Sequence, residues 1–426
     1  MLTTPRHTSK LSLFFLFCFT LILTLLLSLP WVNAKETPKP KPQDWQIEGI
    51  VAALDDSYDK VKGYALDKLG EYELKDLKTV FKKPEEIAQK VANILKDEKV
   101  DSFVRGSAAE ALGKFGQAAA QYIPDIANIL KDEKVDSFVR SSAAEALGKF
   151  GQAAAQYIPD IANILKDEKV KSYVRGSAAV ALGKFGQAAA QYIPDIANIL
   201  KDEKVDSDVR GSAAVALGNF GQAAAQYIPD IANILKDEKV DSHVRGSAAS
   251  ALGNIGQAAA QYIPDILKFL KDEKVASIVR GSAAVALGNI GQAAAQYIPD
   301  ILKILKDEKV DSFVRRSAAE ALGKFGQAAA QYIPDIANIL KDEKVDSNVR
   351  RSAAEALGKF GQAAAQYIPD ILKILKDEKV NSDVRSSVAE ALGKLGQAAA
   401  QYIPDIANIL KDEKVNSDVR GSAASA

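Results

Sequence analysis

Few side chains in this chain could carry out acid–base or nucleophilic chemistry. Beyond residue 34 the sequence has one histidine, His243, and neither cysteine nor methionine. A serine or cysteine nucleophile needs a neighbouring base, most often histidine, so His243 would have to serve any such centre. Equivalent positions in the repeated units described below hold Phe103, Tyr173 and Asp208 instead. We therefore interpret His243 as a surface variant and not as a catalytic base.

The carboxylates and glycines recur too regularly to mark one reactive centre. Asp132 and Glu133 form an acidic pair that returns in every turn, which is typical of a solvated loop. No group of His and Cys residues has the spacing of a zinc site. The glycines recur as LGxxG at helix ends, whereas a phosphate-binding loop follows a strand. The sequence predicts a protein that is not an enzyme and has no catalytic, cofactor or metal residues.

A unit of 35 residues repeats almost verbatim and must position every other feature. Asp101–Val135 reads DSFVRGSAAEALGKFGQAAAQYIPDIANILKDEKV, and nine such copies follow one another without insertion to Val415. A fixed period of this length is typical of a solenoid, in which each unit buries its apolar face only against its neighbours. The set of equivalent positions at this interval is called a column below and is named by its first member.

The first half of each unit has the apolar pattern of an amphipathic helix. In Ser102–Gly116, Val104, Ala108, Leu112 and Phe115 recur at helical spacing and form one stripe. Asp101 or Ser102 can cap this helix, and Gly116 ends it. We call it the Val-Arg helix.

The second half predicts another helix, from about Ala118 to Lys131, which we call the proline helix. Pro124 falls inside it, so either the helix kinks there or its regular part begins there. The polar stretch Lys131–Lys134 is the turn to the next unit.

The runs IPDIANILKD and VRxSAAxALGxxG resemble the HEAT repeat, most closely the subgroup called phycobilisome-lyase HEAT-like repeats. The resemblance implies an all-α fold, a right-handed α-solenoid of tandem 35-residue helix-turn-helix repeats, with the Val-Arg helix on the concave surface. It also implies a structural ladder in which a turn Asp pairs with the Arg of each unit. The Arg residues are Arg105, Arg140, Arg175, Arg210, Arg245, Arg280, Arg315, Arg350 and Arg385, with Arg420 beyond them. Asp132 lies seven residues before Val139, two more than in the family, so the Asp partner stays open. We expect each Arg to be mostly buried and paired with a turn carboxylate or a carbonyl.

The chain begins with a predicted targeting segment. Arg6 and Lys10 precede the apolar run Leu11–Leu29, and Val32 and Ala34 suit cleavage after residue 34. Residues 1–34 are therefore a predicted signal peptide, or a membrane anchor through residues 11–29 if uncleaved, since 19 apolar residues could just span a bilayer. The protein is then exported to a periplasm, a lumen or the extracellular space, or stays membrane-anchored.

The remaining boundaries follow from the repeat. Residues 35–43 are a Pro/Lys linker, 44–100 a divergent N-terminal capping repeat, 101–415 the nine repeats, and 416–426 a truncated tenth repeat. In the capping repeat, eight extra residues lie between the two helices.

The copies differ mainly in the columns of Phe103, Gly106, Glu110 and Lys114, which share one helix face about 80° wide. We predict that this face is the concave surface, charged at both ends and neutral in the middle. Its ends carry i,i+4 pairs such as Glu110/Lys114 and Glu320/Lys324. The predicted partner-binding residues are Val180, Val215, Asn219, His243, Ser250, Asn254, Ile278, Val285 and Asn289.

These observations favour a non-enzymatic scaffold, an exported α-solenoid that binds a protein or peptide on its concave face. The 55 basic and 55 acidic side chains cancel, so no net charge attracts nucleic acid. The resemblance leaves a chromophore-lyase-like or lyase-accessory role as an alternative. A structural or surface repeat protein, whose repeat number matters more than any site, is the other.

Overall fold

The computed structural model describes residues 44–71 and 84–426, in which helices follow one another through short turns. The predicted signal segment and linker, residues 1–43, lie outside these residues, as do most of the eight extra residues of the capping repeat. None of the helices in the described part is long and apolar enough to cross a membrane.

The helices alternate as the repeat predicts. The capping repeat contributes α2 (Asp44–Ala53), α3 (Asp59–Glu71) and α5 (Pro84–Lys96). The Val-Arg helices are α6 (Ser102–Phe115), α8 (Ser137–Phe150), α10 (Ser172–Phe185), α12 (Ser207–Phe220), α14 (Ser242–Ile255), α16 (Ser277–Ile290), α18 (Ser312–Phe325), α20 (Ser347–Lys359), α22 (Ser382–Lys394) and α24 (Ser417–Ser425). The proline helices are α7 (Ile123–Lys131), α9 (Ile158–Lys166), α11 (Ile193–Lys201), α13 (Ile228–Lys236), α15 (Ile263–Lys271), α17 (Ile298–Lys306), α19 (Ile333–Lys341), α21 (Ile368–Lys376) and α23 (Ile403–Lys411).

Most Val-Arg helices have the ends that the first unit predicts, although α10 and α16 begin after Lys171 and Ala276, which give no side-chain cap. The Asp101 carboxylate accepts a hydrogen bond from the Phe103 amide at 2.9 Å, so Asp101 and not Ser102 is the N-cap. Gly116 ends the helix with φ +51°, a conformation that a side chain would disfavour. The predicted stripe, Val104 to Phe115, is buried.

The proline helix is shorter than the sequence suggests. Residues 116–122 form a 3-10 turn, η1 (Gly116–Tyr122), and the α-helix begins at Ile123. Pro124 has no amide hydrogen, and its ring would clash with the carbonyl four residues earlier. The Ala120 carbonyl instead accepts from the Ile123 amide, three residues later, as in a 3-10 turn. Of the two alternatives for Pro124, the regular helix begins there, and the expected helical start at Ala118 is wrong.

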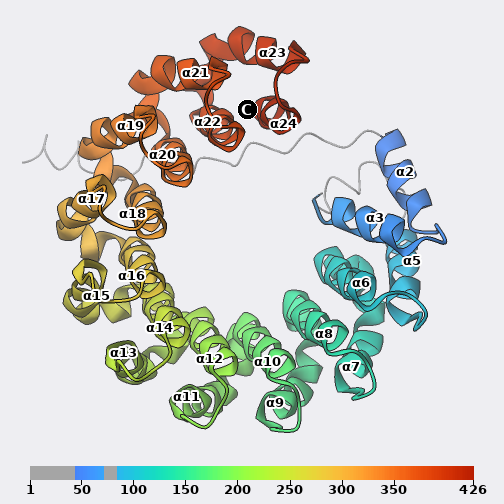
Figure 1. The fold of residues 1–426 in the computed structure, drawn as a ribbon. Helices are drawn as coiled ribbons and strands as arrows, with labels where there is room; N and C mark the ends of the chain where they lie inside the picture. The colour runs from blue at the N-terminus through green and yellow to red at the C-terminus, as the bar shows by residue number, and fades with distance from the viewer. Residues whose placement is uncertain (1–43, 72–83) are drawn as a thin grey trace, which may run out of the picture. The chain divides into compact units, whose positions relative to one another are not determined.

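Successive Val-Arg helices pack directly on one another and lie on the inner side of the curved array, with the proline helices outside (Figure 1). Their contact is unusually close. A Cβ placed on Gly113 would lie 2.9 Å from the Ala146 Cα, and the next eight junctions repeat this spacing at 2.6–3.0 Å. Only glycine fits such an approach of two backbones.

The predicted Arg ladder is buried, as expected, but its partner is a carbonyl. From Arg105 to Arg385, each Nε donates to the carbonyl of the leucine ten residues earlier, at 2.9–3.1 Å. That leucine lies in the last turn of the preceding proline helix, where carbonyls have no partner within the helix. Each arginine therefore caps the helix of the neighbouring unit. Arg420 is only half-buried.

The turn aspartates do not pair with these arginines. The Asp132 carboxylate accepts from the Lys134 amide at 2.9 Å and closes the exposed turn. An ion-pair ladder does exist on the outer side, between a lysine at the end of one proline helix and the aspartate at the start of the next. It begins with Lys96–Asp125 at 3.2 Å and continues to Lys376–Asp405 at 2.6 Å. The lysines and aspartates are substantially exposed, so each pair contributes about 0–1 kcal/mol.

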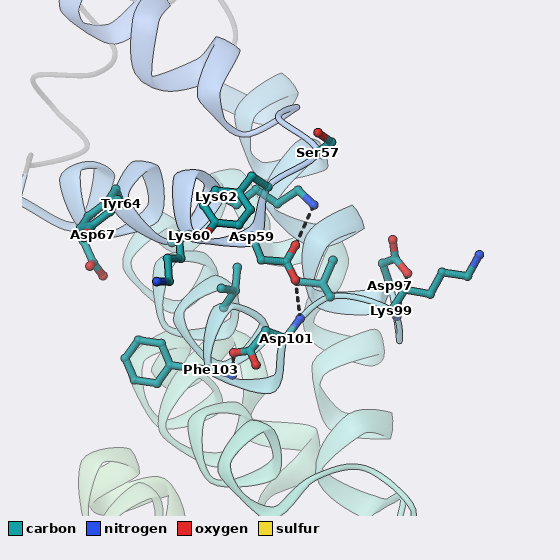
Figure 2. Close-up of a pocket in the computed structure, with 14 residues that line it drawn as sticks. Ser57, Asp59, Lys60, Lys62, Tyr64, Asp67, Asp97, Lys99, Asp101 and Phe103 are labelled. Atoms are coloured by element: carbon teal, nitrogen blue, oxygen red, sulfur yellow. Dashed lines mark hydrogen bonds and ion pairs between the residues drawn. The ribbon is translucent and has the colours of Figure 1, made fainter.

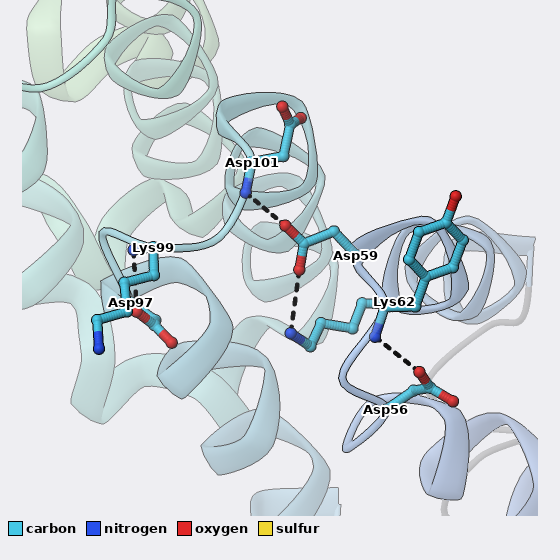
Figure 3. A network of polar contacts seen from close by, with 7 residues as sticks. Asp56, Asp59, Lys62, Asp97, Lys99 and Asp101 are labelled. Carbon is cyan, nitrogen blue, oxygen red and sulfur yellow. Dashed lines mark hydrogen bonds and ion pairs between the residues drawn. The ribbon is translucent and has the colours of Figure 1, made fainter.

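The capping repeat is joined to the first full unit by a polar network around Asp59 (Figure 3). One carboxylate oxygen of Asp59 accepts from the Asp101 amide at 2.9 Å, and the other accepts from the Lys62 ammonium at 3.1 Å. The amide hydrogen bond and then the Lys62 contact lower the pKa of Asp59 below its ordinary value of 3.8.

We expect Arg245→Ala to destabilise the array more than Lys236→Ala, which serves as its control. Arg245 is buried, and its loss leaves the Leu235 carbonyl without a donor, at a cost of about 1–3 kcal/mol. Lys236 is exposed and pairs with Asp265, so its removal should cost less than about 1 kcal/mol. Urea unfolding of the two variants measures the difference in stability. Equal urea midpoints would contradict the role of Arg245 as the cap of the Leu235 carbonyl.

Acid should loosen the junction of the capping repeat before it loosens the other turns. The pKa of Asp59 is lower in the folded protein than in the unfolded chain, so its stabilisation is present above pH 3.8 and is lost as the pH falls through the folded value. Hydrogen exchange of residues 97–104 should therefore lose protection as the pH falls below about 3.8. Residues 132–139, the same turn one unit later, are the control, and Asp59→Asn should abolish the difference between the two.

Candidate binding surface on the inner helices

Three columns of the Val-Arg helices carry side chains that reach solvent on the inner side in every unit: those of Phe103, Glu110 and Lys114. Their spacing of seven and four residues places them on one face of a helix. We call this face the inner surface.

The Gly106 column was expected on this face, and the structure agrees only toward the C-terminal end. Arg316, Arg351 and Ser386 are half-buried and reach solvent, whereas the six earlier members of the column are buried.

Gly106 is buried against the next Val-Arg helix, where a Cβ would collide with the Phe138 ring. Gly281 is in the same position against Phe313. The two columns are coupled, because the room beside position 106 depends on the residue 32 positions later. Ser107 is half-buried at the edge of the face, but other serines of its column, such as Ser142, are buried.

The predicted partner-binding residues all lie on four neighbouring Val-Arg helices, α10, α12, α14 and α16, in the columns of the inner surface. Asn219, His243, Asn254 and Ile278 are exposed, whereas Val180, Val215, Ser250, Val285 and Asn289 are half-buried. The structure thus brings the predicted set together on one continuous stretch of surface; whether it binds a partner remains a prediction.

Asparagine side chains provide amide groups at several positions on this stretch. The Asn289 amide donates to the Asn254 side-chain oxygen at 3.0 Å, one unit away. Asn219, in the same column on α12, is exposed. His243 is exposed at the start of α14, where its backbone amide donates to the Asp241 cap at 2.7 Å. The middle of the inner surface therefore offers amide donors and acceptors between half-buried valines.

The charged ends of the inner surface form ion pairs only in part as predicted. Lys324 pairs with Glu320 at 2.8 Å, and Arg351 lies 3.8 Å from Glu355. Lys114 instead donates to the Gly70 carbonyl at 3.0 Å, so the expected pair with Glu110 does not form.

Two lysines of these ends, Lys149 and Lys359, have lowered pKa values. Burial beside neighbouring helices is the main cause, and the nearby Glu110 and Glu320 oppose it, respectively. Within residues 44–71 and 84–426, no three His, Cys, Asp or Glu side chains are placed to hold a metal ion.

Two family models match the chain. The model of HEAT repeats matches residues 47–148, 104–172, 193–288, 263–346 and 333–426. The model of the PBS lyase HEAT-like repeat matches residues 174–202. No curated protein matches the sequence.

Several solved structures are similar. One is the karyopherin Kap121p bound to the extreme C-terminus of the protein phosphatase Cdc14p, with 15% identity and a TM-score of 0.45 over 90% of this chain and 45% of that one. Another is importin beta in an ammonium sulfate condition, with 15% identity and a TM-score of 0.46 over 89% of this chain and 56% of that one. The chain spans about half the length of these proteins, and a likeness at this level carries no argument about function.

Because the Gly106 and Phe103 columns are coupled, a second substitution should restore the stability that a first one removes. Gly281→Arg should destabilise the protein by about 1–3 kcal/mol, because the new side chain would meet the Phe313 ring. Phe313→Asn in the same chain should recover most of the loss, since Arg316 is naturally followed by Asn348 at this spacing. Gly246→Arg is the control, because a Cβ there would have its nearest neighbour at 3.3 Å. Thermal melting is measured for Gly281→Arg, Phe313→Asn, the double variant and Gly246→Arg, each against the unchanged protein. If the effects of the two single substitutions simply add in the double variant, the coupling is disproved.

Proposed function

Because this chain belongs to the HEAT-repeat family, we propose that it is a non-enzymatic scaffold whose inner surface binds a protein or peptide. The observation that carries the proposal is the change of chemistry along that surface. Glu and Lys occupy the Glu110 and Lys114 columns toward both ends, whereas Val and Asn occupy them from α12 to α16, with Ser250 the one exception. Repeats that are otherwise nearly identical thus differ where a partner would touch them.

The middle of the inner surface suits a polypeptide. Half-buried valines and the exposed Ile278 give apolar area that a partner can remove from water. The amides of Asn219, Asn254 and Asn289 can each donate to and accept from a peptide backbone. Neutral apolar surface flanked by charge is typical of contact sites.

Charges introduced in the middle should weaken binding without unfolding the protein. Val215→Glu and Val285→Glu place a carboxylate that must lose its water in the contact, so we expect affinity to fall about tenfold or more, which is roughly 1.4 kcal/mol. Folding should change little, because Glu110 and Glu320 occupy the same column. The partner would first be identified by a pull-down with mass spectrometry, and its affinity then measured by calorimetry, with circular dichroism as the check on folding.

Asn128→Lys on α7 is the matched control. Asn128 is exposed on the outer side, and Lys268 and Lys303 already occupy its column. If this control weakens binding while the two Val→Glu variants bind normally, the partner occupies the outer side and the proposal fails.

The lyase-accessory alternative has one observation in its favour, the match of residues 174–202 to the PBS lyase HEAT-like repeat. Incubation of the protein with a bilin and an apo-phycobiliprotein distinguishes the lyase-accessory role from the scaffold role. Attachment of the bilin would replace the scaffold proposal.

We also propose that the protein is exported, which rests on the apolar run at residues 11–29 and on the small residues Val32 and Ala34. N-terminal sequencing of the protein from its native host should find Lys35 first. An intact N-terminus in a membrane fraction would favour the anchor instead.

A further inference from the structure

The junction between the capping repeat and the first full unit departs from the close packing of the other junctions. Leu69-Gly70 on α3 corresponds to Leu112-Gly113 on α6. A Cβ on Gly113 would meet a backbone atom of the next helix, whereas a Cβ on Gly70 would meet only the end of the Lys114 side chain. The backbones of α3 and α6 are therefore farther apart than those of neighbouring Val-Arg helices.

The wider spacing leaves a groove of about 830 Å³ between α3, the turn at residues 97–101 and α6 (Figure 2). Three aromatic side chains of its lining are exposed: Tyr58 by 59%, Tyr64 by 72% and Phe103 by 60%. Phe103 is held in place by stacking on Phe138, with ring centroids 5.3 Å apart. Aromatic rings exposed in this way around a hollow are typical of a binding site.

The acidic side chains of the lining divide into two groups. Asp59, Lys62 and Asp101 belong to the network described above, and the Asp97 carboxylate accepts from the Lys99 amide at 3.0 Å. These contacts fix the walls of the groove.

Asp67 differs from them. Its exposed carboxylate has no hydrogen bond or ion pair with any residue that the structure describes. Figure 2 shows it on α3 beside Tyr64, on the side of the junction toward which Phe103 points. It also borders a smaller hollow of about 130 Å³ that Glu110 lines. The open side of the groove thus combines aromatic faces with an unpaired carboxylate. The lining as a whole carries four carboxylates and, at Lys60, Lys62 and Lys99, three ammonium groups, so it is acidic by one charge.

We propose that this α3–α6 groove binds an extended, proline-rich segment of a partner protein that carries arginine or lysine. Proline-rich chains are already extended before binding, so they lose little conformational freedom when they lie against aromatic rings. A basic side chain of such a segment can pair with Asp67 and lie over the ring of Tyr64. The site is separate from the middle of the inner surface, which begins on α10, and does not depend on the proposal made for it.

The test is a titration of the full chain into a fluorescein-labelled synthetic peptide of alternating proline and arginine, followed by fluorescence anisotropy. We expect saturable binding, and at least tenfold weaker binding of a peptide in which glutamate replaces arginine. Tyr64→Ser and Asp67→Asn should each weaken binding of the arginine peptide about fivefold or more. Tyr173→Ser and Asp383→Asn, which change an exposed tyrosine and an exposed aspartate on other Val-Arg helices, should leave it unchanged.

Melting curves of all four variants check that the fold is kept, and Tyr58→Ser replaces any groove variant that fails this check. Absence of binding, equal binding of the glutamate peptide, or equal losses in the control variants would each overturn the proposal. Tighter peptide binding by the variant Lys39→Glu/Lys41→Glu would also overturn it, because the chain's own Pro/Lys segment, residues 35–43, would then be the occupant.

Discussion

The close approach of neighbouring Val-Arg helices at the Gly113 column is the constraint on which the rest of the structure depends. A Cβ at any of the nine glycines from Gly113 to Gly393 would come within about 3.0 Å of an alanine backbone atom. The inner helices can therefore approach closely, whereas isoleucine and leucine side chains such as Ile126 and Leu130 fill the space around the proline helices. Small residues inside and large ones outside explain why the Val-Arg helices occupy the inner side of the curve (Figure 1).

The same constraint limits where the units can differ. Close packing buries the glycines of the Gly106 column from Gly106 to Gly281, whereas the columns of Phe103, Glu110 and Lys114 reach solvent in every unit. A larger side chain in the buried columns would collide with the next unit, as the contact between Gly281 and Phe313 illustrates. Side chains in the Glu110 and Lys114 columns meet the next unit through polar groups that reach solvent, as in the hydrogen bond between Asn289 and Asn254. The sequence varies in these columns while the helix packing stays the same.

Much of this architecture could be predicted from the sequence because a repeated pattern averages out local ambiguity. The helix pairs, the Asp101 cap, the break at Gly116 and the buried arginine column all follow from residue type and spacing. The sequence left the partner of Arg105 open between a carboxylate and a carbonyl, because a backbone carbonyl carries no signal in the sequence. The Lys96–Asp125 ladder had a signal, a lysine and an aspartate 29 residues apart in every unit, but that spacing acquires meaning only when the outer helices are known to stack.

The inner surface and the α3–α6 groove differ in how far the sequence could locate them. The predicted inner-surface residues lie together because each is in register with the repeat. The groove depends on the distance between two backbones at the one described junction where the register shifts, and Tyr64 falls in a column that holds serine in the nine full repeats.

A chain of nearly identical units gives each interface the same strength, and each unit touches only its neighbours. The buried arginine caps and the glycine contacts therefore set a uniform scaffold, to which the exposed Lys–Asp ladder adds little. In such a scaffold no repeated feature can distinguish one binding site from the next unit along. Specificity has to come from departures from the repeat, such as the neutral middle and the widened junction at Gly70 on the Val-Arg side of the described residues.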